Sequence, residues 1–204
     1  MNGGRQFDAK RLAALILFFA DECADDRYFG ATKLNKLLFT ADFWAYGYLG
    51  QSITGSTYVH QEHGPTPEPR LFLSTRDELV DSGCLKIVTE GTYKGIRKRP
   101  VAEVEPDLSL FTEDELSICK DAIEHLCSMT AHESREWSHS FLGWRYTGNG
   151  DVIPYYTAFL WHENLVTRSD ILWGMRMAEE LGLERETTRW GVDTMSRARI
   201  ASYA

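Results

Sequence analysis

The sequence predicts a mainly α-helical protein of the α+β type: a single helical domain around a central buried helix, with one small antiparallel β-hairpin. Three observations support this class. Apolar residues recur at helical spacing over most of the chain. Residues 32–48 are apolar on two sides, as in a helix that more than one layer covers. Residues 84–105 form two short extended segments around a turn, which is typical of a hairpin.

The composition limits the classes of function. Of the 204 residues 43% are hydrophobic and 25% are charged, which is ordinary for a globular protein with a sizeable core. The formal net charge of -8 argues against a general surface for nucleic acid or for anionic membranes. The apolar run 12–20 is far shorter than the roughly 20 residues of a membrane span, so we expect no membrane segment and no signal peptide.

The four cysteines bear on the redox compartment. Cys23, Cys119 and Cys127 fall on apolar stripes of predicted helices, Cys84 starts a predicted strand, and none forms a C-x-x-C pair. We therefore expect buried, reduced thiols and a cytoplasmic location. No histidine or helix N-terminus stands beside them as an activator, so we expect no catalytic thiol.

Two helices are predicted after a loose terminus over residues 1–6. The first spans residues 7–24, and the second spans residues 32–48 with Gly47 and Gly50 as stop signals. One apolar stripe of the second helix comprises Leu34, Leu37, Leu38, Ala41, Ala45 and Tyr48. The other comprises Phe39, Phe43 and Tyr46, and the polar exceptions are Lys33, Asn35, Lys36 and Asp42.

A polar loop follows the central helix. Residues 53–55 predict a turn and residues 57–60 a short strand. Three prolines within residues 65–69 stiffen the next loop, and Pro69 suits the first turn of a helix over residues 70–82. The expected inward side chains of that helix are Phe72, Leu73, Leu79 and Val80. The hairpin strands are predicted over residues 84–89 and 97–105.

Two capping boxes, Thr112–Glu115 and Thr130–Glu133, predict the starts of two further helices. The buried stripe of the first is Leu116, Cys119, Ile123, Leu126 and Cys127. The second carries Trp137 and Phe141, with Trp144 in the loop after it. A helix that starts near Pro154 and another that Ser169 caps and Gly182 ends complete the prediction. We expect a domain over residues 1–165 and a helical extension over 166–204 packed on it.

Chemistry-bearing residues form no convergent group, so we expect no enzyme activity, no cofactor and no metal. His60 and His63 invite a metal site, but a zinc ion needs three or four ligands and only Glu62 is near. Adjacent Ser138 and His139 diverge on a helix and cannot pair directly. Polar histidines that bond backbone groups, and a helix contact, are the simpler readings.

Two surfaces are candidates for binding. A stiff loop rimmed by aromatic residues suits a protein partner, and the residues predicted for it are His60, His63, Gly64, Pro65, Tyr58 and Trp44. The alternative is a winged-helix-like DNA-binding regulator that uses the basic hairpin 86–99. Its predicted phosphate contacts are Lys94, Arg97, Lys98 and Arg99. The helix before this hairpin is nearly neutral, so DNA binding is the weaker reading.

Several short motifs together resemble a known family. They are Lys33-Leu34-x-Lys36-Leu37-Leu38-Phe39-x-Ala41, Gly50, Ile53-Thr54-Gly55-x-x-Tyr58, Gly64-Pro65, Ser138-His139, Trp144 and Ile153-Pro154-Tyr155. In order and spacing they resemble the Panacea domain, the SocA-like antitoxin domain that also occurs in phage-associated proteins. The resemblance covers about residues 9–160. Residues 44–47, the proline-rich run 65–69 and the tail after about 166 depart from it.

The resemblance implies a largely helical domain without enzyme activity. It implies an antitoxin of a toxin-antitoxin system, which neutralises a cognate protein toxin by direct binding, with the toxin encoded by the adjacent gene. An adaptor role that delivers the toxin to a cellular protease is the alternative mode of neutralisation. The identity of the toxin, a homodimer, and binding of the protein to its own promoter stay open at this point.

Overall fold

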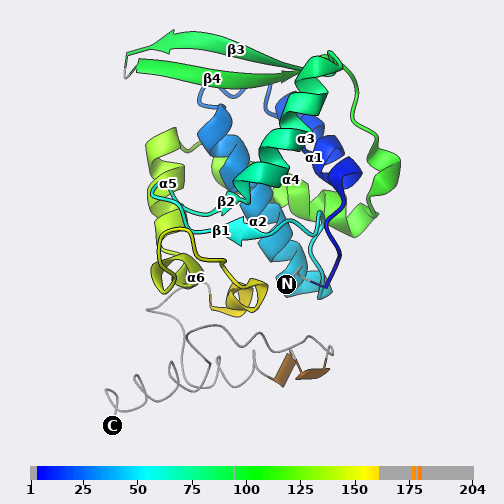
Figure 1. Ribbon diagram of the computed structural model, residues 1–204, viewed down its shortest axis with the longest axis vertical. Coiled ribbons are helices and arrows are strands. Elements are labelled where there is room, and N and C mark those ends of the chain that lie inside the picture. Colours follow the sequence, from blue (N-terminus) through cyan, green and yellow to red (C-terminus); the bar gives the residue numbers. More distant parts are fainter. Residues whose placement is uncertain (1–3, 94, 161–175, 178, 181–204) are drawn as a thin grey trace.

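The computed structural model describes residues 4–93, 95–160, 176–177 and 179–180. Within these residues the predicted fold class is confirmed, because the chain is mainly helical with small antiparallel β elements (Figure 1). Lys94 and the tail 184–204 lie outside the described residues, and so does most of the helix predicted after Ser169.

The central helix is α2 (Ala31–Leu49), which confirms the prediction for residues 32–48. It contacts α1 (Ala9–Glu22), the later helices α4 (Glu113–Cys127) and α5 (Ala131–His139), and the 3-10 helix η2 (Tyr155–Phe159). Asp8 caps α1 by accepting hydrogen bonds from two backbone N–H groups of its first turn. The helix α2 passes through Gly47 and ends at Gly50, whose φ of 76° is the left-handed conformation common after a helix.

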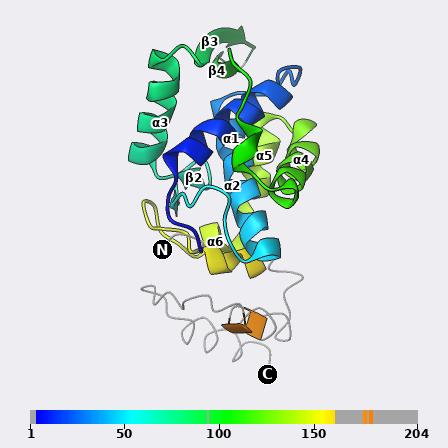
Figure 2. The ribbon, with the colours of Figure 1, turned by 90° about the vertical axis from the view of Figure 1, so that its right-hand side faces the viewer.

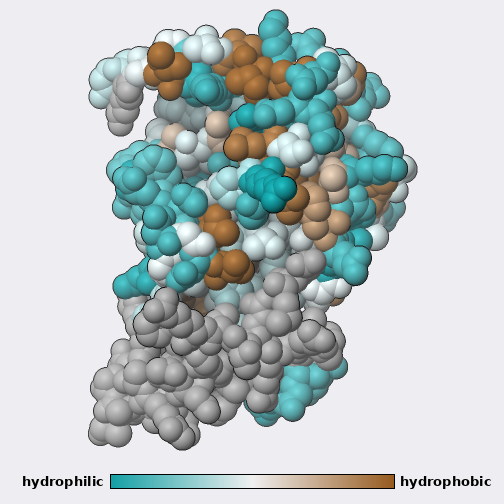
Figure 3. Space-filling model, in the orientation of Figure 1, coloured by the Kyte–Doolittle hydropathy of each residue, from teal (hydrophilic) through white to brown (hydrophobic). Residues whose placement is uncertain are grey.

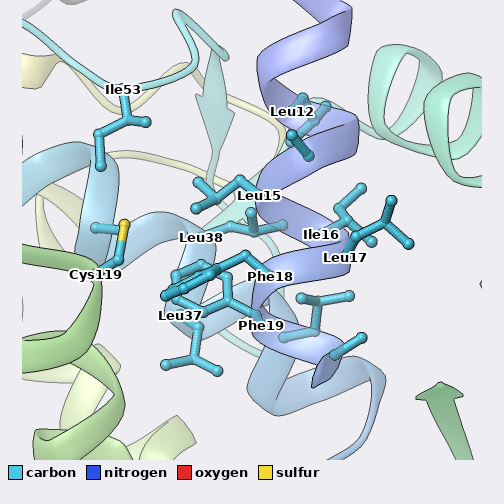
Figure 4. Packing of buried hydrophobic residues seen from close by; sticks show 14 of the residues in the cluster. Leu12, Leu15, Ile16, Leu17, Phe18, Phe19, Leu37, Leu38, Ile53 and Cys119 are labelled. Atoms are coloured by element: carbon cyan, nitrogen blue, oxygen red, sulfur yellow. The ribbon is translucent and has the colours of Figure 1, made fainter. Parts of the chain in front are cut away.

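The two predicted stripes of α2 face two separate clusters. The larger cluster joins α1, α2 and α4, and its side chains interdigitate as Figure 4 shows for Leu15, Leu38 and Cys119. The second is aromatic and brings Phe39, Phe43 and Tyr46 against Tyr58, Phe141, Ile153 and Tyr155. Full burial of each such side chain contributes about 1.5–3 kcal/mol. The prediction for Tyr48 is wrong, because this residue is 78% exposed near the end of the helix.

The helix α3 (Pro69–Asp81) begins with Pro69 in its first turn, as predicted, and Glu68 caps it. Only Phe72, Thr75 and Leu79 are buried, because α3 packs with one narrow stripe on α1. The predicted inward positions of Leu73 and Val80 are therefore wrong, since both are exposed. Figure 3 shows hydrophobic surface residues around α3 and the hairpin, interspersed with hydrophilic ones.

The hairpin consists of β3 (Leu85–Thr92) and β4 (Gly95–Ala102). Its strands pair antiparallel, and Pro100 stands opposite Ile87. A second, shorter ladder joins β1 (Tyr58–Val59) to β2 (Thr66–Pro67), so the proline-rich loop supplies the partner of the predicted strand 57–60. Val59 also bridges to Val152, which ties this ladder to the C-terminal half of the domain.

Both capping boxes are present, at the starts of α4 (Glu113–Cys127) and α5 (Ala131–His139). The 3-10 helix η1 (Leu108–Leu110) precedes α4. The buried stripe of α4 is rotated from the predicted one and comprises Glu115, Ile118, Cys119, Ala122 and Leu126. Cys127 is consequently exposed, which corrects the expectation of four buried thiols, and Cys84 is half-buried. All four cysteines are free.

The chain turns sharply after α5. This helix ends at His139, so Phe141 does not continue it, and Phe141 instead precedes the short helix α6 (Leu142–Arg145). Trp144 lies on α6 and not in a loop. The helix predicted near Pro154 is the 3-10 helix η2 (Tyr155–Phe159). In the view of Figure 2, α3 lies on one side of the α1–α2 pair and α4 and α5 lie on the other. None of the helices described here is both long and apolar enough to cross a membrane.

Candidate partner-binding site

Motif residues that are far apart in the sequence converge at two places along α2. At the first, the buried carboxylate of Asp42 accepts four hydrogen bonds of 2.5–2.8 Å, from the N–H groups of Ile53 and Thr54 and from the hydroxyls of Thr54 and Tyr58. Burial raises the pKa of Asp42, and the hydrogen bonds from Thr54 and Tyr58 oppose that shift. Asp42 thereby fixes the path of the turn that follows α2.

Tyr58 and Tyr155 complete this first cluster. Tyr58 is 0% exposed, and its hydroxyl donates to Asp42. The Tyr155 hydroxyl donates to the carbonyl oxygen of Ser56 at 2.7 Å, and its ring stacks on Phe43 with 4.5 Å between the centroids. Burial is the largest cause that raises the pKa of both tyrosines, so both stay protonated donors. The Asp42 cluster is a scaffold beneath the surface.

At the second place, Lys36 holds the proline-rich loop against α2. Its Nζ atom donates to the carbonyl oxygen of Pro65 at 2.9 Å, and the residue is 1% exposed. Gly64 has a φ of 95°, and a Cβ atom there would lie 2.4 Å from Ser138 Oγ and 2.6 Å from Lys36 Nζ. Only glycine fits this position, because both the backbone conformation and the space exclude a side chain. The loop, α2 and α5 thus meet at Gly64.

Trp144 lies between two histidine rings. Its ring stacks on His139 with 3.9 Å between centroids and 6° between planes, and on His60 with 4.3 Å and 15°. Trp144 Nε1 donates to the carbonyl oxygen of Gln61 at 3.0 Å. His60 Nδ1 lies 2.8 Å from the carbonyl oxygen of Trp144, so this nitrogen carries the proton and donates. These contacts hold residues 60–65 against α5 and α6.

The electrostatics of this second cluster are basic. Burial, and then the charge of Arg135, lowers the pKa of Lys36 to about 7. Burial also lowers the pKa of His139, with Arg135 as the next cause. Among the described residues, Arg135 Nε and His139 Nε2 are buried atoms without a hydrogen-bond partner.

The six residues predicted for partner contact occupy different environments. His63 is exposed and His60 is half-buried, while Gly64 and Pro65 are the buried part of the loop. Tyr58 is in the core, and Trp44 is half-buried on another side of α2, with its ring 5.6 Å from that of His125 on α4. The structure therefore brings four of the six together: His60, His63, Gly64 and Pro65.

The structure adds residues to this loop that the sequence reasoning did not place there. Lys36, Ser138, His139 and Trp144 were placed in predicted helices or a loop but not in the binding site, so their membership in one motif was the available signal. Arg135 carried no signal, because it lies outside the motif pieces. We call the group His60–Pro65, Lys36, Arg135, Ser138, His139 and Trp144 the loop-stack site.

The chemical alternatives for these residues can be compared with their contacts. Ser138 Oγ donates to the carbonyl oxygen of Arg135 at 2.8 Å and lies under Gly64. His60 Nδ1 is engaged by Trp144. In the described part of the chain, no group of three or more His, Cys, Asp or Glu residues is arranged to hold a metal ion.

The basic hairpin uses two of its arginines inside the protein. Arg97 pairs with Glu90 at 2.5 Å and donates to the carbonyl oxygen of Arg27. Arg99 donates to the carbonyl oxygen of Asp26 at 2.9 Å and to those of Cys23, Ala24 and Phe29. These bonds tie β4 to the turn after α1. Lys98 is exposed, and Lys94 lies outside the described residues.

Comparison with known proteins gives one match. A family model described as antitoxin SocA-like, Panacea domain, matches residues 34–145. The matched span begins in α2 and ends in α6, so it contains the whole loop-stack site and Asp42. The comparison with curated proteins yields no match, and neither does that with solved structures.

Proposed function

Because this chain belongs to the SocA-like Panacea antitoxin family, we propose that it neutralises a cognate protein toxin by binding it directly through the loop-stack site. The adjacent gene is the expected source of this toxin. The observation that carries the proposal is the convergence of Lys36, Gly64-Pro65, Ser138-His139 and Trp144 beside the exposed His63, although about one hundred residues separate them in the sequence.

The construction of the site suits recognition of a protein. Trp144 and the two histidine rings offer flat edges beside the exposed His63, and aromatic groups are enriched at the energetic centres of interfaces. The backbone of the loop is held at both ends, by Lys36 at Pro65 and by Trp144 at Gln61. A surface that is already ordered loses less conformational entropy on binding.

The basic hairpin does not provide comparable support for DNA binding. Two of the four residues predicted to contact phosphate, Arg97 and Arg99, donate to groups within the protein. An arginine whose donors hold the fold together has fewer left for a phosphate. We therefore propose the protein-binding function alone.

Co-expression tests the proposal. The adjacent gene is induced alone and together with this chain, and growth and co-purification are measured. We expect growth to stop when the adjacent gene is induced alone and to resume when this chain is expressed with it. The two proteins should co-purify, and Trp144→Ala should lower the affinity of their complex by about tenfold or more. Tyr48→Ala is the matched control, because Tyr48 is an exposed aromatic residue at the end of α2. A neighbour that is harmless alone would overturn the proposal for this protein.

The mode of neutralisation is measured in the same cells. We propose that steric blocking suffices, since the loop-stack site is ordered without a partner. Blocking predicts that the half-life of the toxin is unchanged or longer when this chain is present. A shorter half-life that depends on a cellular protease would establish delivery in place of blocking.

A further inference from the structure

Three basic side chains meet at the loop-stack site. The helix α5 carries Arg135 and His139 one turn apart on one face, and α2 carries Lys36. A Cβ atom at Gly64 would lie 2.6 Å from Lys36 Nζ and 2.4 Å from Ser138 Oγ, so Lys36 reaches the part of α5 that carries the other two. In agreement with this placement, Arg135 is, after burial, the next cause that lowers the pKa of Lys36 and of His139. The lowered pKa values reduce the charge on Lys36 and His139 in the free protein and leave Arg135 as the permanent cation.

Among the described residues, each of these side chains has a buried nitrogen whose hydrogen-bonding capacity is not filled. Arg135 Nε and His139 Nε2 are buried and unpartnered. Lys36 is 1% exposed, and its ammonium group has one acceptor, the carbonyl oxygen of Pro65. Glu136 offers little compensation, because its Oε1 atom is 3.9 Å from Arg135 Nε. Of the Arg135 side chain 36% is exposed, so a partner can reach its charge. Because buried donors without acceptors are unfavourable, the site is prepared for an anion.

We infer that Lys36, Arg135 and His139 form an anion-binding point within the loop-stack site, and that the bound toxin supplies the anion as the carboxylate of an acidic side chain. The inference rests on the proposed function and names the chemistry of the partner. A carboxylate accepts from several N–H donors at once, and its charge attracts Arg135 and favours the protonated forms of Lys36 and His139. The chain has a net charge of -8 and repels acidic surfaces in general, so a local basic point also specifies where an acidic group is accepted.

This arrangement makes binding depend on the protonation of Lys36. In the free protein the pKa of Lys36 is lowered to about 7, and a carboxylate beside it raises that pKa in the complex. The contribution of Lys36 to affinity is therefore present in full below about pH 7 and is lost as the pH rises through the higher pKa of the complex. The groups that face Lys36 are Arg135 and His139 from α5 and the Pro65 carbonyl from the loop. His60 faces His139. The pKa of His139 is lowered, so its own titration appears at lower pH.

The test measures the affinity of the full chain for the product of the adjacent gene between pH 6.5 and 9. We expect Arg135→Glu to weaken binding by about tenfold or more. Arg76→Glu on α3 is the matched control, because it makes the same change of charge at a residue paired with the exposed Asp77, and we expect less than about a twofold effect. Lys36→Met is expected to bind without the loss of affinity between pH 7 and 9 that the unchanged chain shows. Circular dichroism verifies that each variant is folded.

The outcomes separate the two proposals. Failure of the unchanged chain to bind the neighbouring product overturns the proposed function, and the inference with it. If the Arg135→Glu and Arg76→Glu variants bind the neighbouring product equally well, the proposed function stands and the anion-binding point is overturned. A charge swap gives the decisive support: an Asp or Glu of the partner changed to Arg weakens the unchanged complex and restores binding to the Arg135→Glu variant.

Discussion

The rings of His139 and Trp144 lie parallel, 3.9 Å apart between centroids, although one residue ends α5 and the other belongs to α6. The sharp turn at Phe141 brings the two rings face to face. On its other side Trp144 meets His60 from the loop, so one indole joins three segments of the chain. The face that we propose for toxin binding is therefore assembled by tertiary contacts.

Gly64 is the position at which these segments approach most closely. Gly64→Ala places a methyl group 2.4 Å from Ser138 Oγ at a φ of 95°, so we expect the free energy of unfolding in urea to fall by about 2–5 kcal/mol. Gly83→Ala is the control, because Gly83 has a φ of 74° and no atom within 4 Å of the added carbon. It should cost about 1–2 kcal/mol, from backbone conformation alone. Equal losses would show that the space at Gly64 is not limiting.

Lys36 makes the stability of the free protein depend on pH. Its pKa is lowered from 10.5 in the unfolded chain to about 7 by burial and by Arg135, so the unfolded state binds more protons between these values. The free energy of unfolding should therefore rise from pH 7 to 9, by up to about 1.4 kcal/mol per pH unit from this residue. Lys36→Met should lack this rise. Urea unfolding of both proteins at pH 7, 8 and 9 measures the difference, and parallel curves would contradict the prediction.

The hairpin depends on Arg99 more than on its neighbour. Arg99→Ala leaves carbonyl oxygens of the turn after α1 without their donor, so we expect a loss of about 1–3 kcal/mol in the free energy of unfolding. Lys98→Ala removes an equal charge from the exposed side of the same strand and should change it by less than about 0.5 kcal/mol. Thermal unfolding of the two variants provides the comparison. A larger effect at Lys98 would contradict the assigned contacts.

Cys127 should be the thiol that reacts fastest with an aromatic disulfide reagent. It is exposed, whereas Cys23 and Cys119 are buried and Cys84 is half-buried. Burial raises the pKa of Cys23 to about 12 and also raises the pKa of Cys119, so neither supplies thiolate at neutral pH. Absorbance should show one fast phase, which Cys127→Ser removes. A fast phase that survives this substitution would contradict the assignment.

The loop-stack site was predicted in part. The loop 60–69 was identified from its prolines and its polar character, which are properties of a few adjacent residues. Tyr58 and Trp44 were included because aromatic residues near a stiff loop are common at interfaces, but the same residues also suit a core. The structure places Tyr58 beside Asp42 and Trp44 beside α4, since Asp42 and Trp44 lie on different sides of α2.

The sequence by itself determined the elements whose signals are local. The capping boxes at Thr112 and Thr130, Pro69 in the first turn of α3 and the two stripes of α2 depend on residues within one or two turns of each other. Such patterns establish that a helix exists and which sides of it are apolar. They also carry the family motif, from which the antitoxin class follows.

Only the tertiary structure decided which polar groups meet. The exposure of Cys127 depends on a small rotation of α4. The hydrogen bonds of Arg99 to the turn after α1 depend on where the hairpin lies. Lys36 and Arg135 come together because the crossing of α2 and α5 places them there, although ninety-nine positions separate them in the chain. Contacts at such separations follow from the packing of whole elements, and no pattern within one element specifies them.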